Sequence, residues 1–314
     1  RKRKNAKYDS ILGLSGGVDS SYVAYLAYKM NLNPLCVHFD NGWNSEIAIK
    51  NIKKIISKTN FDFFTYVIDW PEFRDLQRSF FKAGVIDIEM LTDHAIFSAL
   101  FKIRKEHKLD TVLSGTNYVT EHGLPFSWIW PKMDYTNIKS IHKKFGSLPI
   151  KSYPKMSNLK WLIMKNFDLG GIFEEPLNLV NYSKKRAMKT LKDFFDWEYY
   201  GGKHYESVFT KFYQAYVLIE KFKVDKRRSH LSCLIRNEEI SRDEAQNDLS
   251  KPAYNNSDLI RDKKFVLKKL GFSENEFEKI MSDDPVSHDE FKTDQIYIKP
   301  MSFFYKTIFK RASY

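Results

Sequence analysis

The stretch Ser15-Gly-Gly-Val-Asp-Ser-Ser21 decides the fold, because it joins a short apolar run, Ile11 to Leu14, to a helical pattern that continues to Met30. Glycines let a backbone approach an anion closely, and the first turn of a helix presents N–H groups and positive potential. The serine hydroxyls add hydrogen-bond donors. Asp19 fits beside phosphate only if a cation stands between them, so the stretch predicts an anion-binding loop with Mg²⁺ at Asp19.

Strand and helix patterns alternate over the first 120 residues. Short apolar runs recur at residues 35–39, 63–68 and 111–114, with helical spacing at 47–56 and from Asp93 onward. Short strands that alternate with helices form a parallel sheet with helices on both faces, and ligands bind at the carboxyl ends of its strands. We therefore expect a Rossmann-like α/β fold whose ligand site lies where these strands end.

The alternation of strand and helix patterns does not continue in the rest of the chain. Residues 123–181 carry five prolines and less regular patterning, which predicts a long excursion with a domain transition inside it. After Tyr182 the chain reads as mainly helical, with capping-box patterns at Ser241 and Ser273 and a helix-ending Gly271. We expect a nucleotide-binding domain over 1–180 and a mainly helical region for acceptor binding or oligomerisation over 181–314.

Composition limits the class of protein. The 314 residues carry a net charge of +12, which fits nucleic acid, ATP and nucleotide sugars, or an anionic membrane, and equally a solvated Lys-rich surface. The two cysteines, Cys36 and Cys233, give neither a disulfide framework nor a CxxC metal pair. No apolar run approaches the roughly 20 residues that span a bilayer, and no signal peptide is evident, so we expect a cytoplasmic protein.

The ends of the sequence give two further expectations. The chain lacks an initiator Met and begins close to its first strand, so we expect the ordered part of a longer protein. The stretch from Tyr297 to Arg311 mixes aromatic and basic residues at helical spacing. It predicts a docking or dimerisation helix, with an interfacial membrane helix as the alternative.

The anion-binding loop points to one superfamily. It contains neither the GxxxxGK[ST] of a Walker A loop nor the dinucleotide-binding GxGxxG, and it matches SGGxDS. It therefore resembles the PP-loop ATP pyrophosphatases, which convert ATP to AMP and pyrophosphate to activate a carbonyl oxygen. The resemblance implies an adenine nucleotide alpha hydrolase-like fold, with ATP and Mg²⁺ as cofactors. The ATP-binding residues that it implies are Ser15, Gly16, Gly17, Asp19, Ser20, Ser21, His38, Phe39, Asp40, Gly115 and Thr116.

A second resemblance covers most of the chain. The blocks at residues 93–96, 115–121, 200–207, 225–232 and 242–245 resemble the N-acetyl sugar amidotransferases of lipopolysaccharide O-antigen biosynthesis. The resemblance implies adenylation of the N-acetyl oxygen of a nucleotide-linked sugar, typically UDP-linked, and its replacement by ammonia to give an acetamidino group. The chain has no glutaminase signature, so a separate glutaminase subunit would supply the ammonia. A Cys-rich, zinc-binding segment that often begins such proteins is absent from this sequence.

This resemblance also assigns site residues. Together with the anion-binding loop and the Gly201-Gly202 turn, it leads us to expect catalytic roles for Asp19, Ser20, Glu121, Lys203 and His204, and substrate binding by Asp93, His94, Asn117, Arg227, Arg228, His230 and Ser232. Several of them have a plain structural alternative. Asp93 is explained as a helix N-cap, and the basic run 226–230 as a solvated helix face.

Two other functions remain open at this point. A tRNA-modifying PP-loop enzyme is favoured only by the net charge, because the thiolating members use a cysteine, often a pair, and no such pair is present. A catalytically silent nucleotide-binding scaffold is disfavoured by the intact loop with Asp19.

Overall fold

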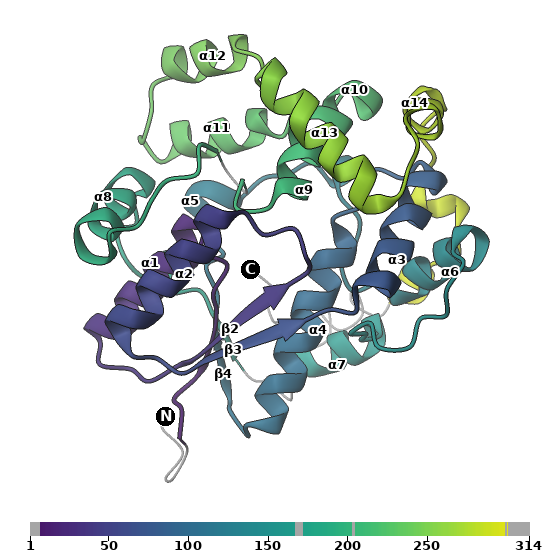
Figure 1. Cartoon of the computed structure of the whole chain (residues 1–314). Helices are drawn as coiled ribbons and strands as arrows, with labels where there is room; N and C mark the ends of the chain where they lie inside the picture. Colours follow the sequence, from purple (N-terminus) through teal and green to yellow (C-terminus); the bar gives the residue numbers. More distant parts are fainter. Residues whose placement is uncertain (1–6, 167–171, 203–204, 299, 301–314) are drawn as a thin grey trace.

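The computed structural model describes residues 7–166, 172–202, 205–298 and 300. At its centre lies a five-stranded, all-parallel sheet with the order β3-β2-β1-β4-β5 (Figure 1). Ile11 of β1 pairs with Leu35 of β2 on one side and with Val112 of β4 on the other. The strands span Ile11–Gly13 (β1), Leu35–Asp40 (β2), Phe63–Val67 (β3), Thr111–Leu113 (β4) and Ile172–Glu174 (β5). The predicted Rossmann-like α/β fold is confirmed.

Helices cover both faces of the sheet, because alternate strand residues point to opposite sides. Leu12 packs into one apolar cluster with α1 (Val18–Lys29), α2 (Glu46–Thr59) and α8 (Lys184–Phe195). Its neighbour Ile11 packs on the other side, against Leu100 and Ile103 of α4 (Met90–Glu106). These clusters pack β1 and β2 against helices on both faces of the sheet.

The excursion predicted over 123–181 is more regular than its prolines indicate. It contains α6 (Tyr135–Phe145), α7 (Asn158–Asn166) and the fifth strand of the sheet, β5. The sheet continues to residue 174 and α8 packs against α1, so the boundary at residue 180 separates segments that are in contact. The domain division stays a prediction.

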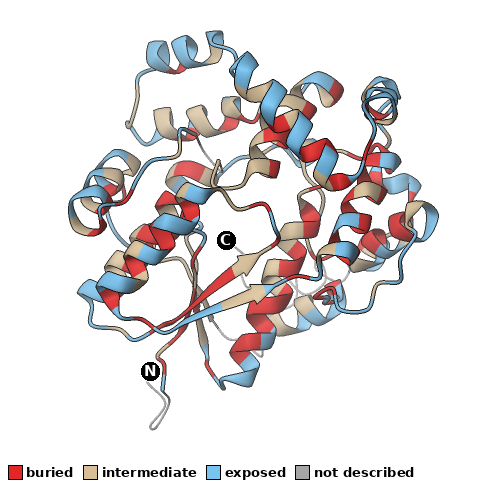
Figure 2. Ribbon diagram, viewed as in Figure 1, coloured by how far each residue is buried: buried red, intermediate tan, exposed pale blue. Residues whose placement is uncertain are grey.

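The second half of the chain is helical, as expected, and shares its core with the first half. Phe209, Phe212 and Phe277 pack in one cluster with Phe73 and Phe80 of α3 (Trp70–Ala83). Figure 2 shows buried residues along helices of both halves of the chain. The helices of this half are α9 (Val208–Phe212), α10 (Leu218–Phe222), α11 (Arg227–Arg236), α12 (Arg242–Ser250), α13 (Asn256–Leu270) and α14 (Glu274–Ser282). A π-helical turn, η3 (Tyr213–Val217), joins α9 to α10.

The capping predictions hold in this region. Ser241 and Glu244 form a reciprocal capping box, and Gly271 ends α13 in the left-handed conformation at φ +74°. Ser273 caps α14 by accepting a hydrogen bond from the backbone of Glu276. The aromatic stretch predicted as a docking helix lies almost entirely outside the described residues.

Short elements complete the fold. They are α5 (Tyr118–Glu121) and the 3-10 turns η1 (Phe126–Trp128), η2 (Pro176–Asn178) and η4 (His288–Glu290). None of the helices in the described ranges has the length and apolar composition needed to cross a membrane.

The second half contacts the sheet next to the end of β2. The Ser45 N–H donates to the Glu206 carbonyl at 2.8 Å, and the Val208 N–H donates to the Trp43 carbonyl at 2.9 Å. Asn44 and Ser207 form an isolated antiparallel bridge between them. This pairing brings residues 206–208 to the edge of the sheet where the ligand site is predicted.

Candidate active site

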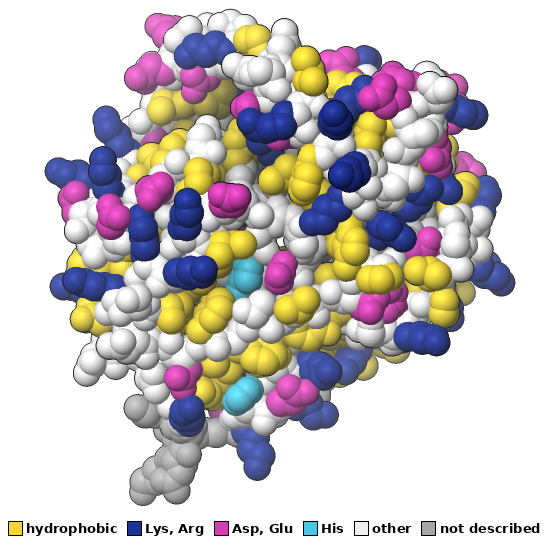
Figure 3. All heavy atoms as spheres, in the orientation of Figure 1, with side chains coloured by type: hydrophobic (Ala, Val, Ile, Leu, Met, Phe, Trp, Pro, Cys, Tyr) yellow, Lys and Arg dark blue, Asp and Glu magenta, His cyan; other side chains and the backbone are white. Residues whose placement is uncertain are grey.

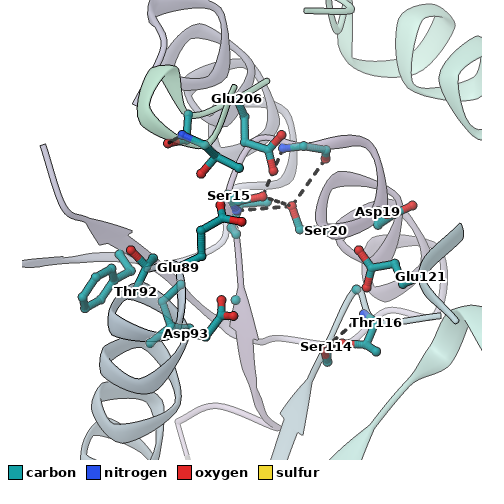
Figure 4. A pocket seen from close by; sticks show the side chains of 18 of the residues that line it. Ser15, Asp19, Ser20, Glu89, Thr92, Asp93, Ser114, Thr116, Glu121 and Glu206 are labelled. Carbon is teal, nitrogen blue, oxygen red and sulfur yellow. Dashed lines mark hydrogen bonds between the residues drawn. The ribbon is translucent and has the colours of Figure 1, made fainter. Parts of the chain in front are cut away.

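A cavity of about 550 Å³ lies at the carboxyl ends of β1, β2 and β4. Its walls come from the Ser15–Ser21 loop, the first turn of α4, the segment after β4 and the second half of the chain. Figure 4 shows the carboxylates of Asp19 and Glu121 on one side, and on the opposite side those of Glu89 and Asp93 at the start of α4. Polar loops thus converge where the sequence predicts a ligand.

The loop from Ser15 to Ser20 is preorganised for an anion. The Gly17 N–H donates to the Ser15 hydroxyl at 3.2 Å, and the Ser15 and Ser20 hydroxyl oxygens lie 3.0 Å apart. Gly16 has φ +81°, and a β-carbon there would stand 2.4 Å from the Ala48 carbonyl oxygen. A side chain at residue 16 is therefore excluded, and the loop keeps its N–H groups at the N-terminus of α1.

The segment after β4 approaches this loop at van der Waals distance. A β-carbon at Gly115 would stand 2.9 Å from the Ser20 backbone nitrogen. Thr116 also lines the cavity, and its hydroxyl shares a hydrogen bond with the Ser114 hydroxyl at 2.9 Å. Glycine is required at residue 115 for the same reason as at residue 16, because another backbone segment lies where a side chain would be.

Asp19 is held by two hydroxyl groups. Tyr182 donates a hydrogen bond to its Oδ1, and Thr120 donates to its Oδ2 at 3.4 Å. The carboxylate lines the cavity beside Glu121 (Figure 4). Mg²⁺ is commonly bound by one or two carboxylates together with substrate phosphates, so this arrangement fits the ion. Within the described ranges, no group of three or more His, Cys, Asp or Glu side chains is placed to hold a metal.

The cavity also has an apolar section that suits a flat heterocycle. Its lining includes Gly13, Leu14, Val37, Phe39, Ile96 and Leu100. His38 closes one edge: its Nδ1 lies 3.0 Å from the Leu14 carbonyl oxygen, and its Nε2 lies 3.1 Å from the Asn44 amide nitrogen. Burial lowers the pKa of His38, so the ring is neutral with its hydrogen on Nδ1.

The wall opposite the anion-binding loop contains paired charges. Glu89 lies 3.2 Å from the Lys226 ammonium and receives a hydrogen bond from the Gln214 amide at 2.8 Å. Lys132 lies 3.1 Å from Asp93 and 2.7 Å from the buried Asp87. Burial raises the pKa of Asp93, and the Lys132 ammonium opposes that shift.

A second cavity of about 370 Å³ adjoins the first. Its walls come from α11, the loop before α13, and Tyr199, Gly201, Gly202 and Tyr205. Both cavities are lined by five residues: Thr120, Lys184, Gln214, Lys226 and His230. Gln214 belongs to the π-helical turn, a distortion that often marks a functional site. The two cavities therefore meet along a shared wall.

Most of the predicted ATP-binding residues come together as expected. Those that line the first cavity are Ser15, Gly17, Asp19, Ser20, His38, Phe39, Gly115 and Thr116. Gly16 shapes the loop from behind, and Ser21 is fully buried on the inner side of α1. Asp40 does not line the cavity, and its Oδ1 instead accepts hydrogen bonds from the Gly42 N–H and the Asn44 amide.

Some of the predicted catalytic and substrate-binding residues line a cavity, and others do not. Glu121, Asp93 and His230 line the first cavity, and Arg227 and His230 line the second. Lys203 and His204 lie outside the described residues. Asn117 is 2% exposed and caps α5 by accepting from the Thr120 N–H, which is a structural role.

His94 has a structural role in place of the predicted contact with the acceptor. The ring is fully buried, its Nδ1 donates to the Lys132 carbonyl at 2.8 Å, and its Nε2 accepts from the Met156 N–H at 3.2 Å. Burial lowers its pKa to about 4. Helix α4 begins at Met90, so Asp93 lies in the first turn and is not the N-cap, and its neighbour His94 points into the core.

The basic run on α11 also differs from the prediction. Arg227 donates to both carboxylate oxygens of Asp225 and lines the second cavity. Arg228 is exposed and lines neither cavity, and the exposed Ser232 hydroxyl donates back to the Arg228 carbonyl at 2.7 Å. Arg227 therefore faces the second cavity, with its guanidinium bound to Asp225 and to the Asp248 and Lys251 carbonyls, and Arg228 faces solvent, because adjacent helix residues point about 100° apart.

Several further residues that line the cavities were not among the site residues expected from the sequence. Tyr200 accepts a hydrogen bond from the first N–H of α1, that of Val18, at 3.2 Å. The Glu206 carboxylate lies beside Gly17, since a β-carbon there would stand 3.1 Å from its Oε1. Lys184 and Lys226 line both cavities. The block 200–207 was the signal for Tyr200 and Glu206, and no local signal marks Lys184.

The chain is similar to known proteins in two separate segments. Residues 2–143 match the family model described as NAD synthase, and residues 206–306 match the model described as LPS biosynthesis protein WbpG-like, C-terminal domain. An uncharacterized protein of Methanocaldococcus jannaschii is 30% identical over 172 residues, which are 54% of this chain. The chain spans 58% of the length of that relative.

A solved structure shows a more distant likeness. The NMN synthetase of Francisella tularensis is 20% identical, over 37% of this chain and 48% of its own, with a TM-score of 0.31. The two family matches cover the anion-binding loop and the helical second half separately. The chain is therefore similar to the NAD synthase family over residues 2–143 and to the C-terminal domain of WbpG-like LPS biosynthesis proteins over residues 206–306.

Proposed function

We propose that the chain is an ATP-dependent amidotransferase of O-antigen biosynthesis that acts on a nucleotide-linked, typically UDP-linked, acetamido sugar. It adenylates the N-acetyl carbonyl oxygen and replaces it with ammonia, which gives an acetamidino group and releases AMP and pyrophosphate. The observation that carries the proposal is the shared wall of the two cavities, one built on the PP-loop and the other by the WbpG-like half.

The first cavity fits ATP. The N–H groups at the start of α1 and the hydroxyls of Ser15 and Ser20 suit the pyrophosphate, and the apolar section between Phe39 and Leu100 suits adenine. Asp19, with Glu121 beside it, would hold Mg²⁺. The ion, when bound, would neutralise charge on the departing pyrophosphate.

The second cavity fits the nucleotide sugar. Tyr199 and Tyr205 offer aromatic faces on which a base stacks, and Arg227 and Lys251 offer charge to a diphosphate or a uronate carboxylate. The N-acetyl group would lie at the shared wall, within reach of the α-phosphate. Positioning two substrates across this wall is the main contribution of the protein to catalysis.

The chemistry has two steps. In the first, the acetamido oxygen forms a bond to the α-phosphorus, and the bond to the β-phosphate oxygen breaks with its electron pair on pyrophosphate. In the second, ammonia adds to the imidate carbon, one proton leaves the new nitrogen, and AMP departs with the oxygen. The product is a cationic amidinium.

The charge of the cavity suits such a product. In the described part of the chain its lining includes the carboxylates of Asp19, Glu89, Asp93, Glu121 and Glu206 and the ammonium groups of Lys132, Lys184 and Lys226. A protein of net charge +12 thus has more carboxylates than ammonium groups around this site. We also propose a separate glutaminase as the ammonia source and a cytoplasmic location, where ATP and nucleotide sugars are available.

Pyrophosphate release tests the proposal. We expect release from ATP and Mg²⁺, with ammonium present, to depend on a UDP-linked diacetamido sugar, and mass spectrometry to detect an amidino product. Bulk tRNA is the comparison substrate, because net positive charge is what favours the tRNA-modifying alternative. Lys and Arg side chains spread over the face seen in Figure 3, with acidic side chains between them. Release with tRNA alone would replace the proposal by the tRNA-modifying alternative.

The arginine pair on α11 provides a matched test of the second cavity. Arg227→Ala removes charge from its wall, so we expect affinity for the sugar nucleotide to fall about tenfold, the loss of one charged hydrogen bond. Arg228→Ala changes an exposed side chain, and we expect less than a twofold change. Calorimetric titration of both variants measures this, and equal losses would remove Arg227 from the substrate site.

A further inference from the structure

The PP-loop of this protein supplies no cation of its own. Ser15 to Ser21 contains no lysine or arginine, whereas the α-phosphate gains charge as the acceptor oxygen attacks it. A cationic side chain for this phosphate, in addition to the Mg²⁺ proposed at Asp19, would come from another part of the cavity. Within the described ranges, the lysines that line the first cavity are Lys132, Lys184 and Lys226.

Two of these lysines lie on the wall opposite the loop. Lys132 is within 3.1 Å of both Asp87 and Asp93, and Lys226 is 3.2 Å from Glu89. Glu89 and Asp93 lie at the start of α4, across the cavity from Asp19 (Figure 4). These contacts fix both ammonium groups at the carboxylates of that wall.

Lys184 lies on the side of the loop itself. Tyr182, two residues earlier, donates its hydroxyl hydrogen to Asp19 on the first turn of α1. Ser183 caps α8 by accepting from the Arg186 N–H at 3.3 Å, so the backbone at residue 184 is held as the first residue of that helix. The side chain lines both cavities, with its nitrogen 5.8 Å from the centre of the Tyr199 ring.

We propose that Lys184 is a catalytic residue whose ammonium group binds the α-phosphate during adenylation. The inference rests on the proposed function and adds a residue to it. The acceptor oxygen bonds to the α-phosphorus while the bond to pyrophosphate breaks, and Lys184 keeps its proton and offsets the charge on the oxygens of the α-phosphate. Residue 184 lies between the two segments that match family models, 2–143 and 206–306, so neither match assigns it a role.

Binding measurements test the contact without the reaction. AMP carries the α-phosphate and adenosine lacks it, so wild-type protein should bind AMP more tightly in calorimetric titrations without Mg²⁺. In Lys184→Ala we expect affinity for AMP to fall about tenfold, the loss of one charged hydrogen bond, with adenosine affinity unchanged. Lys185→Ala, a change at the exposed neighbour, should leave both affinities at the wild-type level.

Three results would overturn the assignment. They are wild-type protein that binds AMP no more tightly than adenosine, a Lys184→Ala loss that is equal for both ligands, and a Lys185→Ala loss as large as that of Lys184→Ala. Lys184→Arg keeps the charge and should recover most of the affinity for AMP. If Lys184→Ala does not fold, Lys184→Gln, which keeps a long side chain, replaces it under the same criteria.

Rate measurements then separate this inference from the proposed function. With the sugar nucleotide present, Lys184→Ala should release pyrophosphate about 10²-fold more slowly at saturating ATP, as expected for the loss of one group that stabilises developing charge. A wild-type protein without acceptor-dependent release would contradict the proposed function. The binding contrast between AMP and adenosine would still decide whether Lys184 contacts the α-phosphate.

Discussion

Asp19→Ala should lower pyrophosphate release by about 10³-fold, the scale expected when a preorganised electrostatic group is removed from an active site. Asp19 is the carboxylate of the PP-loop itself, and Tyr182 and Thr120 both donate hydrogen bonds to it. Its removal takes away the residue that would hold Mg²⁺ beside the pyrophosphate. It also leaves the buried Tyr182 hydroxyl without its acceptor, at a cost of about 1–3 kcal/mol.

Asp19→Asn separates the two effects. Asparagine keeps an oxygen that accepts the Tyr182 hydrogen bond, so we expect near wild-type thermal stability with activity still lost, because the negative charge is gone. Asp193→Ala, at an exposed carboxylate on α8, is the control and should retain full activity. Turnover in Asp19→Asn within a few-fold of wild type would contradict the role of this carboxylate.

The fold and the anion-binding loop were predictable because their signals are local. The glycines, serines and Asp19 lie within seven consecutive residues, between a strand and a helix that have their own periodicities. The missed elements had weaker local signals. Strand β5 is three residues long and follows a proline-containing segment, and helix α6 lies between prolines at 131 and 149. Tertiary packing against α3 and the sheet supports these elements where periodicity alone did not reveal them.

The contacts between distant residues around the cavity were not predictable because the partners meet only in the folded chain. Lys226 is 137 positions from Glu89, and Tyr182 is 163 positions from Asp19. His94 shows the converse limit. A histidine at the opening of a helix was expected to contact the acceptor, but α4 begins three residues earlier than expected, at Met90, and His94 lies on its buried side. The local sequence pattern indicates the type of site. Which side chain reaches the site depends on where the helix begins and on which side of it each residue lies.

Lys132→Met should lower the free energy of unfolding by about 3–5 kcal/mol at pH 7, the usual result of leaving a buried charge unpaired. The Asp87 side chain is 1% exposed, and both of its oxygens lie within 3.0 Å of the Lys132 ammonium. Burial alone would raise the pKa of Asp87. The Lys132 and Lys226 ammonium groups and a hydrogen bond from the Trp130 N–H outweigh burial and hold it below 3.8.

The predicted loss depends on pH with a definite sign. In wild-type protein the lowered pKa of Asp87 contributes stability above pH 3.8, which is lost as the pH falls through the folded-state pKa. Without Lys132, burial raises the pKa of Asp87, and the penalty grows as the pH rises. The difference between wild type and variant should therefore be largest at pH 7 and shrink at pH 5, as measured by urea unfolding.

Two further variants make the measurement specific. Asp87→Asn added to Lys132→Met removes the unpaired charge and should recover most of the lost stability. Lys279→Met breaks an ion pair with Asp283 whose side chains are 74% and 56% exposed, and it should cost less than about 1 kcal/mol. A Lys132→Met loss that matches the Lys279→Met loss, or that does not change between pH 7 and pH 5, would mean that Asp87 does not depend on Lys132. In that case apolar packing, and not the Lys132 ion pairs, would stabilise the wall opposite the PP-loop. Charged residues of that wall could then be substituted without unfolding the site.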